Sequence, residues 1–225
     1  MISHIKQDIM KFIIRLAFLW VLVFGISCNK EETIVDTPEQ VGISTVTYYV
    51  VITLNGPAFE SIVVGQPYVD SGATAEENGQ PTTYTTSGTV DTETEGIYTI
   101  TYTAVNKDGY ASSATRNVAV IPSAPLPGVD LSGTYANVGS AALTADISMV
   151  APGVYYTTNC WGGSSGAVIP AYFFCSDGIS ITVPTQQFSA YGTLEGEGTY
   201  TAGKIAWTIN LVDLNFAANK AWQKE

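Results

Sequence analysis

The chain has 225 residues, with nine Lys and Arg against 20 Asp and Glu. That length permits one or two domains, each large enough to bury a core. The single histidine, His4, lies in a segment that we expect to be cleaved. A mature chain without histidine excludes histidine-based catalytic triads, histidine metal ligands and histidine acid–base catalysis.

The N-terminus has the pattern of a secretory signal. Three basic residues within the first 15 precede the apolar run Leu16–Ile26, which is too short to span a bilayer as a helix. The segment Gly25-Ile26-Ser27-Cys28 resembles a bacterial lipobox, in which cleavage before the cysteine is followed by attachment of lipid to its thiol. The resemblance implies a lipoprotein signal peptide over residues 1–27 and a lipid anchor at Cys28. An ordinary signal peptide or a short membrane anchor is the alternative.

Residues 28–44 are predicted to form an acidic tether, because they are polar and lack periodicity. Removal of the signal leaves six basic and 19 acidic residues, a balance that repels phosphate backbones and excludes nucleic acid as a partner. The segment Asn29-Lys30-Glu31-Glu32 resembles the surface-export signal of Bacteroidota lipoproteins. That resemblance implies a lipid-anchored protein of the outer membrane that faces the cell exterior. A solvated acidic linker is the alternative.

Residues 45–121 are predicted to form a β-sandwich. Short runs of Thr, Val, Tyr and Ile are separated by Gly, Asn and Asp, and sustained helical periodicity is absent outside the signal. The clearest strand is 97–105, in which apolar residues alternate with threonines. A turn at 106–109 leads to a partner strand at 111–120.

Three motifs in this region resemble a known family. Gly96-Ile97-Tyr98 is similar to the tyrosine corner of immunoglobulin-like (Ig-like) sandwiches. With Tyr68–Ala75 and Gly88–Asp91, it makes residues 51–120 similar to the bacterial Ig-like family first defined on an insecticidal crystal protein. Such domains are mostly spacers, so the resemblance implies a spacer. Asp70 is expected to cap a tight turn with its carboxylate.

Residues 122–130 contain three prolines and are predicted to form an extended, semi-rigid linker between two domains. Residues 131–225 are predicted to form a second β domain. Ile205, Trp207 and Ile209 share one face of a strand in this domain, so Trp207 is expected in its core.

This second domain also resembles a family. Its opening Leu131–Tyr135 and its closing Gly198–Tyr200 with Ile205–Ile209 are similar to a C-terminal domain of Bacteroidota surface lipoproteins. That family is often encoded beside Sus-type glycan-uptake genes, which implies a Sus-type transporter complex as a partner. The resemblance implies a small lipocalin-like β-barrel or a flattened sandwich. The expected fold class is all-β, with an Ig-like β-sandwich followed by this domain after a cleaved lipoprotein signal.

Two patterns resemble catalytic motifs, and both have simpler interpretations. Residues 162–166 fit the Gly-x-Ser-x-Gly motif of hydrolases, but neither a helix nor a histidine is expected beside them, which favours a Gly/Ser loop. Glu195 and Glu197 share a strand face at the spacing of glycosidase acids. Gly196 and Gly198 beside them predict an exposed, loosely packed strand. We therefore predict that the chain is not an enzyme and holds no cofactor and no metal.

Cys160 and Cys175 are candidates for a disulfide. The mature protein is expected outside the cytoplasm, where two thiols persist as a bond. Two buried free thiols are the alternative.

Aromatic residues gather around these cysteines, and the candidate ligand-binding residues are Trp161, Tyr155, Tyr156 and Tyr172. Trp161 lies between a cysteine and two glycines, where a large side chain is difficult to bury. Its ring is suited to stack on a sugar or to anchor a protein interface. The alternative is that the cluster simply caps the barrel.

We therefore expect a non-catalytic surface lipoprotein in which an Ig-like spacer presents a β module that binds a polysaccharide, as an accessory of polysaccharide utilisation. The alternative is a structural subunit that docks on an outer-membrane transporter or adhesin. Both hypotheses rest on the association implied by the resemblance, because fold alone does not imply function.

Overall fold

In a computed structural model, the chain divides into two units, residues 1–47 and residues 48–225. The structure describes residues 40–41, 44–162 and 167–225. In the first unit the described residues form two short antiparallel strands, β1 (Gln40–Val41) and β2 (Ser44–Thr45). The predicted signal peptide, the lipidation site Cys28 and the surface-export motif lie outside the described residues.

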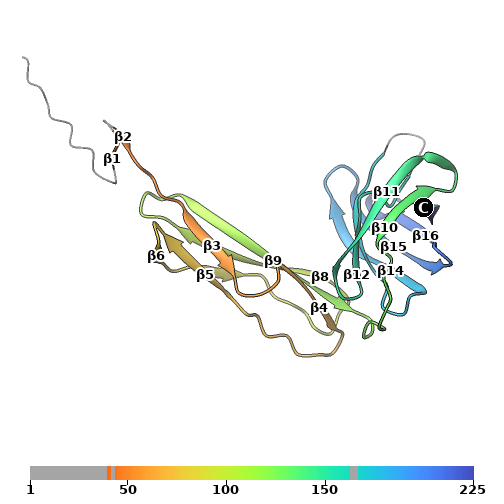
Figure 1. The fold of residues 1–225 in the computed structure, drawn as a ribbon, viewed down its shortest axis with the longest axis horizontal. Coiled ribbons are helices and arrows are strands. Elements are labelled where there is room, and N and C mark those ends of the chain that lie inside the picture. Colours follow the sequence, from red (N-terminus) through yellow and green to blue (C-terminus); the bar gives the residue numbers. More distant parts are fainter. Residues whose placement is uncertain (1–39, 42–43, 163–166) are drawn as a thin grey trace, which may run out of the picture. The chain divides into compact units, whose positions relative to one another are not determined.

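The first part of the larger unit, up to Ile121, is a sandwich of two sheets (Figure 1). One sheet contains three strands, in the order β3 (Val50–Leu54), β5 (Ala73–Glu77) and β6 (Gln80–Pro81). The other contains four strands, in the order β4 (Phe59–Val63), β9 (Ala111–Ile121), β8 (Gly96–Val105) and β7 (Thr85–Ser87). β4 joins β9 in parallel, and the remaining neighbours are antiparallel. We call this part the sandwich.

The paired strands β8 and β9 confirm the pattern seen in the sequence. Ile100, Tyr102 and Ala104 are buried, while the threonines between them are half-buried. The Tyr98 hydroxyl donates to the carbonyl oxygen of Thr94 at 2.9 Å. This bond to a backbone group four residues upstream is the tyrosine corner that the motif predicts.

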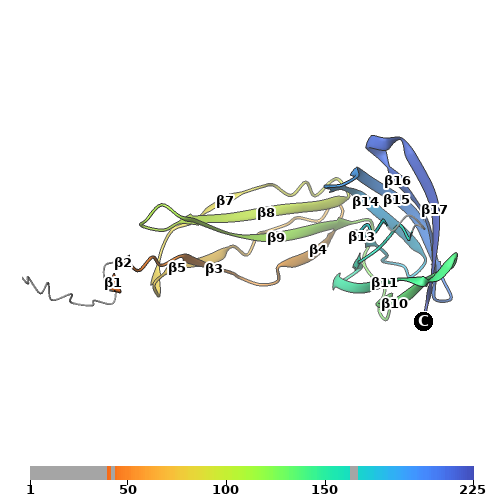
Figure 2. The ribbon, with the colours of Figure 1, turned by 90° about the horizontal axis from the view of Figure 1, so that it is seen from above.

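The rest of the larger unit is a closed barrel of eight antiparallel strands (Figures 1 and 2). In chain order these strands are β10 (Gly133–Asn137), β11 (Ser140–Ala151), β12 (Val154–Thr157), β13 (Ala171–Phe174), β14 (Ser180–Phe188), β15 (Gly192–Thr201), β16 (Lys204–Leu211) and β17 (Phe216–Lys224). A short 3-10 helix, η1 (Val212–Leu214), connects the last two. β17 pairs with both β16 and β10 and so closes the barrel. The fold class is all-β, as predicted, with a closed barrel rather than a flattened sandwich.

Alternate side chains of each strand fill the barrel interior. Ile205, Trp207 and Ile209 of β16 are buried, as their spacing predicts. The indole N–H groups of Trp207 and Trp222 donate to the carbonyl oxygen of Cys160, at 3.1 and 3.4 Å. Buried indoles usually find such a partner. Among the described residues, none belongs to a helix long and apolar enough to cross a membrane.

The sandwich and the barrel share a buried apolar cluster. It joins the end of β9 to the start of the β12–β13 hairpin, and its buried members are Ala119, Ile121, Ala151, Val154 and Phe174. Burial of apolar surface on both sides stabilises this junction, at about 25 cal/mol per Å² removed from water.

Hydrogen bonds add to the junction. The Ser61 hydroxyl donates to the carbonyl oxygen of Pro152 at 2.8 Å. In the linker, the Leu126 N–H donates to the carbonyl oxygen of Ser176 at 2.8 Å. Residues 122–130 therefore lie against the barrel. This differs from the extended rod that the prolines predict, because apolar contacts and backbone hydrogen bonds draw the two parts together.

Candidate functional site

Two of the four candidate ligand-binding residues lie in the barrel core. The Tyr155 ring stacks on Phe173 with ring centroids 5.3 Å apart, and its hydroxyl donates to the carbonyl oxygen of Val129. Burial raises the pKa of Tyr155 to about 12. Trp161 is only 7% exposed, and the Lys220 ammonium lies 4.2 Å from the centre of its ring. The expectation that Trp161 is exposed is wrong, because core side chains surround it.

The other two candidates lie on the outer face of the barrel. Tyr156 and Tyr172 are paired across β12 and β13, with ring centroids 5.1 Å apart. Tyr172 also contacts Phe59 of the sandwich at 5.2 Å. Because neighbouring residues of a strand point to opposite faces, Tyr155 and Tyr156 cannot share a surface. The structure therefore does not bring the four aromatic residues together as one binding platform.

Cys160 and Cys175 are both free and buried, so the predicted disulfide is wrong. The register explains why. Cys175 lies opposite Gly153 and Cys160 lies opposite Ile169, at the two ends of the same β12–β13 hairpin. Seven residues of extended chain separate those ends by about 20 Å, whereas a disulfide needs Cα atoms within about 7 Å.

We predict that neither thiol reacts with Ellman's reagent in the folded chain from Asn29 onward. Burial raises the pKa of Cys160 to about 12 and that of Cys175 to about 11, so the reactive thiolate is scarce. Both should react after denaturation. A Ser189→Cys variant, with its thiol at an exposed position, should react while folded. A mass that increases on reduction of the native chain would contradict this prediction.

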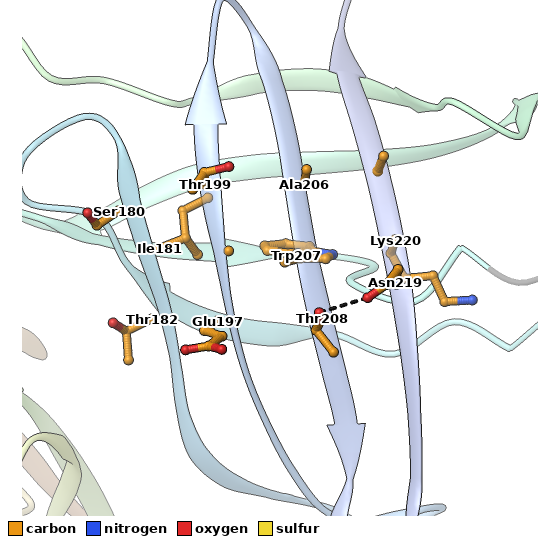
Figure 3. A pocket seen from close by; sticks show the side chains of 12 residues that line it. Ser180, Ile181, Thr182, Glu197, Thr199, Ala206, Trp207, Thr208, Asn219 and Lys220 are labelled. Carbon is orange, nitrogen blue, oxygen red and sulfur yellow. Dashed lines mark hydrogen bonds between the residues drawn. The ribbon is translucent and has the colours of Figure 1, made fainter.

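The clearest hollow on the barrel lies on the outer face of β14 to β17. One row of facing residues crosses these four strands and consists of Thr182, Glu197, Thr208 and Asn219. A second row, two residues further along the strands, consists of Ser180, Thr199, Ala206 and Ala221. Together they line a hollow of about 720 Å³ (Figure 3). The Thr208 hydroxyl donates to the Asn219 side-chain oxygen at 2.8 Å, as Figure 3 shows.

A second hollow of about 390 Å³ continues the first, because both are lined by Thr182, Glu197 and Thr208. It adds Glu195 and Asn210, which face each other on β15 and β16. We call the two hollows together the groove. Three successive outward positions on β15 line it, so it extends about 14 Å along the strands.

The groove exists because the outward side chains along it are short. Thr, Ser, Ala and Asn leave space where longer side chains would fill it. Trp207 lies beneath, 3% exposed, so its ring packs in the core rather than on the surface. A polar outward alternation on three successive strands was the sequence signal for this face.

Chemically, the groove offers hydroxyl, amide and carboxylate groups, and Lys220 also lines its larger hollow. The Thr185 hydroxyl donates to Glu195 at 2.9 Å and orients that carboxylate. Across the part of the chain that the structure describes, no group of His, Cys, Asp and Glu is suited to hold a metal ion. The Gly-x-Ser-x-Gly segment falls largely outside the described residues, at 163–166.

A cluster of charged residues lies in the core of the sandwich, away from the groove. Arg116 is fully buried, forms an ion pair with Asp70 and lies 3.1 Å from Glu60. The Tyr102 hydroxyl donates to Asp70 at 2.6 Å. Asp70 also accepts the Gly72 backbone N–H, as expected of a turn cap. This cluster pairs a buried guanidinium with two carboxylates.

Comparison with known proteins bears on the sandwich. Residues 52–120 match a family described as the Ig-like domain of bacterial surface proteins. The search of curated proteins found no match. One similar solved structure is the lipoprotein BT2262 of Bacteroides thetaiotaomicron, 24% identical, with a TM-score of 0.41, over 78% of this chain and all of that one. The family match confirms the Ig-like domain and fits a protein of the bacterial surface.

Proposed function

We propose that this protein is a non-catalytic, surface-exposed outer-membrane lipoprotein whose barrel binds an uncharged glycan in the groove. The observation that supports this is the groove itself, whose larger hollow of about 720 Å³ on β14 to β17 has hydroxyl, amide and carboxylate groups in its lining. The surface Ig-like family match at 52–120 supports the location. In this proposal Cys28 carries the lipid anchor and the sandwich places the barrel away from the membrane.

The lining groups suit the hydroxyls of a sugar chain. Thr182, Thr208 and Asn219 both donate and accept hydrogen bonds, and Glu197 accepts them. Neighbouring strands space these groups by about 4.8 Å, so successive hydroxyls of one sugar ring can be bound together. Because Trp207 is buried, little stacking is available. We therefore expect binding that is dominated by hydrogen bonds and weaker than on an aromatic platform.

The same geometry supports a binding role over hydrolysis. Glycosidases place two carboxyl groups on opposite sides of the scissile bond. Glu195 and Glu197 instead line one face of a single strand, β15, in an open groove. A chain held there would have both acids on the same side.

The test is affinity gel electrophoresis of the chain from Asn29 onward. The gels contain hydroxyethylcellulose, xyloglucan, galactomannan or laminarin as neutral polysaccharides and polygalacturonate as an acidic one. An Ala206→Trp variant fills the groove from an exposed position on β16. An Ala142→Trp variant, on the exposed face of β11, is the matched control.

We expect at least one neutral polysaccharide to retard the unmodified chain and the Ala142→Trp variant. The Ala206→Trp variant should migrate as it does in a gel without polysaccharide. Equal retardation of both variants would place the binding elsewhere. No retardation by any polysaccharide would overturn the proposed function.

A second candidate function is docking on a membrane transporter or adhesin. Three large apolar side chains are exposed together near the β16–β17 connection, at Val212, Leu214 and Phe216, with 46, 57 and 54% exposure. Exposed apolar patches of this kind favour protein interfaces. Cross-linking on intact cells that depends on Leu214, without any affinity for sugar, would favour this role.

A further inference from the structure

We infer that the sandwich is part of the binding site and that Glu95 completes the groove from outside the barrel. This inference rests on the proposed function. Glu95 lines the same 390 Å³ hollow as Glu195 and Glu197, although it belongs to the turn before β8. The site therefore requires residues of both parts, and the sandwich does more than act as a spacer.

Local structure fixes the backbone at Glu95. The tyrosine corner bonds Tyr98 to the carbonyl oxygen of Thr94, immediately before Glu95. Two residues earlier, the N–H of Glu93 donates to the Asp91 carboxylate at 3.0 Å. The glutamate thus follows a turn that is held at both ends, and β8 begins directly after it. Its carboxylate is free to reach into the hollow because its side chain is exposed.

The junction holds this turn against the barrel. Phe174 of the barrel packs into one apolar cluster with Ile121, and Ile97 of β8 packs against the same cluster. The Phe59 and Tyr172 rings add a contact at 5.2 Å. Ile97 lies two residues from Glu95, so the cluster that joins the two parts also anchors the turn. The backbone at Glu95 is therefore already ordered before a ligand binds, and only the side chain has to be immobilised.

The charge of its lining restricts which ligands the 390 Å³ hollow can bind. Three carboxylates, those of Glu95, Glu195 and Glu197, line it, and its lining contains no Lys or Arg. Carboxylates accept hydrogen bonds from hydroxyl groups and repel uronates and sulfates. The ligand that fits is a hydroxyl-rich chain without negative charge, lying along β15 and ending at the sandwich.

The experiment measures the affinity of the whole chain from Asn29 onward for the neutral polysaccharide that retards it. The test variant is Glu95→Ala. The matched control is Glu93→Ala, an exposed glutamate two residues away that does not line the hollow. A Glu95→Lys variant is run against polygalacturonate at low ionic strength.

Glu95→Ala should weaken binding about fivefold, the usual net effect of losing one hydrogen bond. Glu93→Ala should leave binding unchanged, and Glu95→Lys should produce retardation by polygalacturonate. Binding that is abolished by Ala206→Trp but unchanged by Glu95→Ala would overturn the two-part site and leave the proposed function standing. Absence of binding by the unmodified chain would overturn the proposed function itself, and this inference with it.

Discussion

Replacing Asp70 with alanine should lower the free energy of unfolding by about 3 kcal/mol, because it removes one of the two carboxylates that pair with a buried guanidinium. The Arg116 side chain is fully buried, and Asp70 is one of its two ion-pair partners. Glu60, the other carboxylate, has a side chain that is 23% exposed. In the Asp70→Ala variant Glu60 remains beside Arg116, but the Tyr102 hydroxyl loses the carboxylate to which it donates. Chemical denaturation followed by circular dichroism measures the loss.

Two controls separate the charge effect from a general loss of packing. Glu76→Ala removes an exposed carboxylate from β5 and should change stability by less than about 0.5 kcal/mol. The double variant Asp70→Asn with Arg116→Met removes both charges, so it should be more stable than Asp70→Ala. If Asp70→Ala has the same free energy of unfolding as the unmodified chain, the ion pair does not contribute to stability.

Lowering the pH should reduce the loss of stability that Asp70→Ala causes. Burial alone would raise the pKa of Asp70, but hydrogen bonds from Tyr102, Gly72 and Arg116 outweigh it and hold that pKa below its ordinary value of 3.8. A lowered folded-state pKa contributes stability above the ordinary value, and this stability is lost as the pH falls through the folded value. The difference between Asp70→Ala and the unmodified chain should therefore shrink below about pH 4.

Local sequence patterns predicted the strands well because each depends on residues close together in the chain. The alternation of apolar residues with threonines predicted which face of β8 is buried. The same kind of alternation in β16 predicted that Trp207 lies in the core. The tyrosine corner needs only Thr94 and Tyr98, four residues apart. The closing strand β17 has a single buried residue, Trp222, so its sequence shows little alternation.

The candidate site depends on information that such patterns lack. The disulfide prediction failed on register, because spacing in the sequence does not show that Cys160 and Cys175 lie at opposite ends of a hairpin. Trp161 appeared exposed because its partners, including Lys220, lie about 60 residues further along the chain. The groove appears only when four strands are placed side by side. Glu95 joins it only once the sandwich and the barrel meet.

Gly196 and Gly198 of β15 are packed more tightly than their sequence predicts. Gly196 and Gly198 were expected to mark a loosely packed strand. A Cβ added at Gly198 would instead lie 2.4 Å from the Ala206 carbonyl oxygen and 2.5 Å from the Trp207 Cβ. Under 3.0 Å from backbone, such a contact forces the neighbouring strand to move. The glycines therefore mark positions beside the groove where β16 leaves no room for a side chain on β15.

Gly198→Ala should consequently destabilise the barrel by about 3 kcal/mol, the upper range for overpacking a core. The clash meets backbone and the buried Trp207, so a rotamer change cannot relieve it. Separation of β15 from β16 should also deform the groove and abolish the binding of neutral polysaccharide. Thermal unfolding measures the first effect, and hydrogen exchange of the β15 and β16 amides shows where the strands open.

Thr199→Ala is the matched control, one residue further along β15 with its side chain exposed. Because alanine only shortens an outward side chain there, its stability should stay within about 0.5 kcal/mol of the unmodified chain. If hydrogen exchange becomes faster only in β15 and β16 of the Gly198→Ala variant, the glycine is needed for the pairing of these strands and for the shape of the groove. Unchanged stability of Gly198→Ala would mean that β15 and β16 are further apart than described. A groove that depends on their close approach would then be overturned as well.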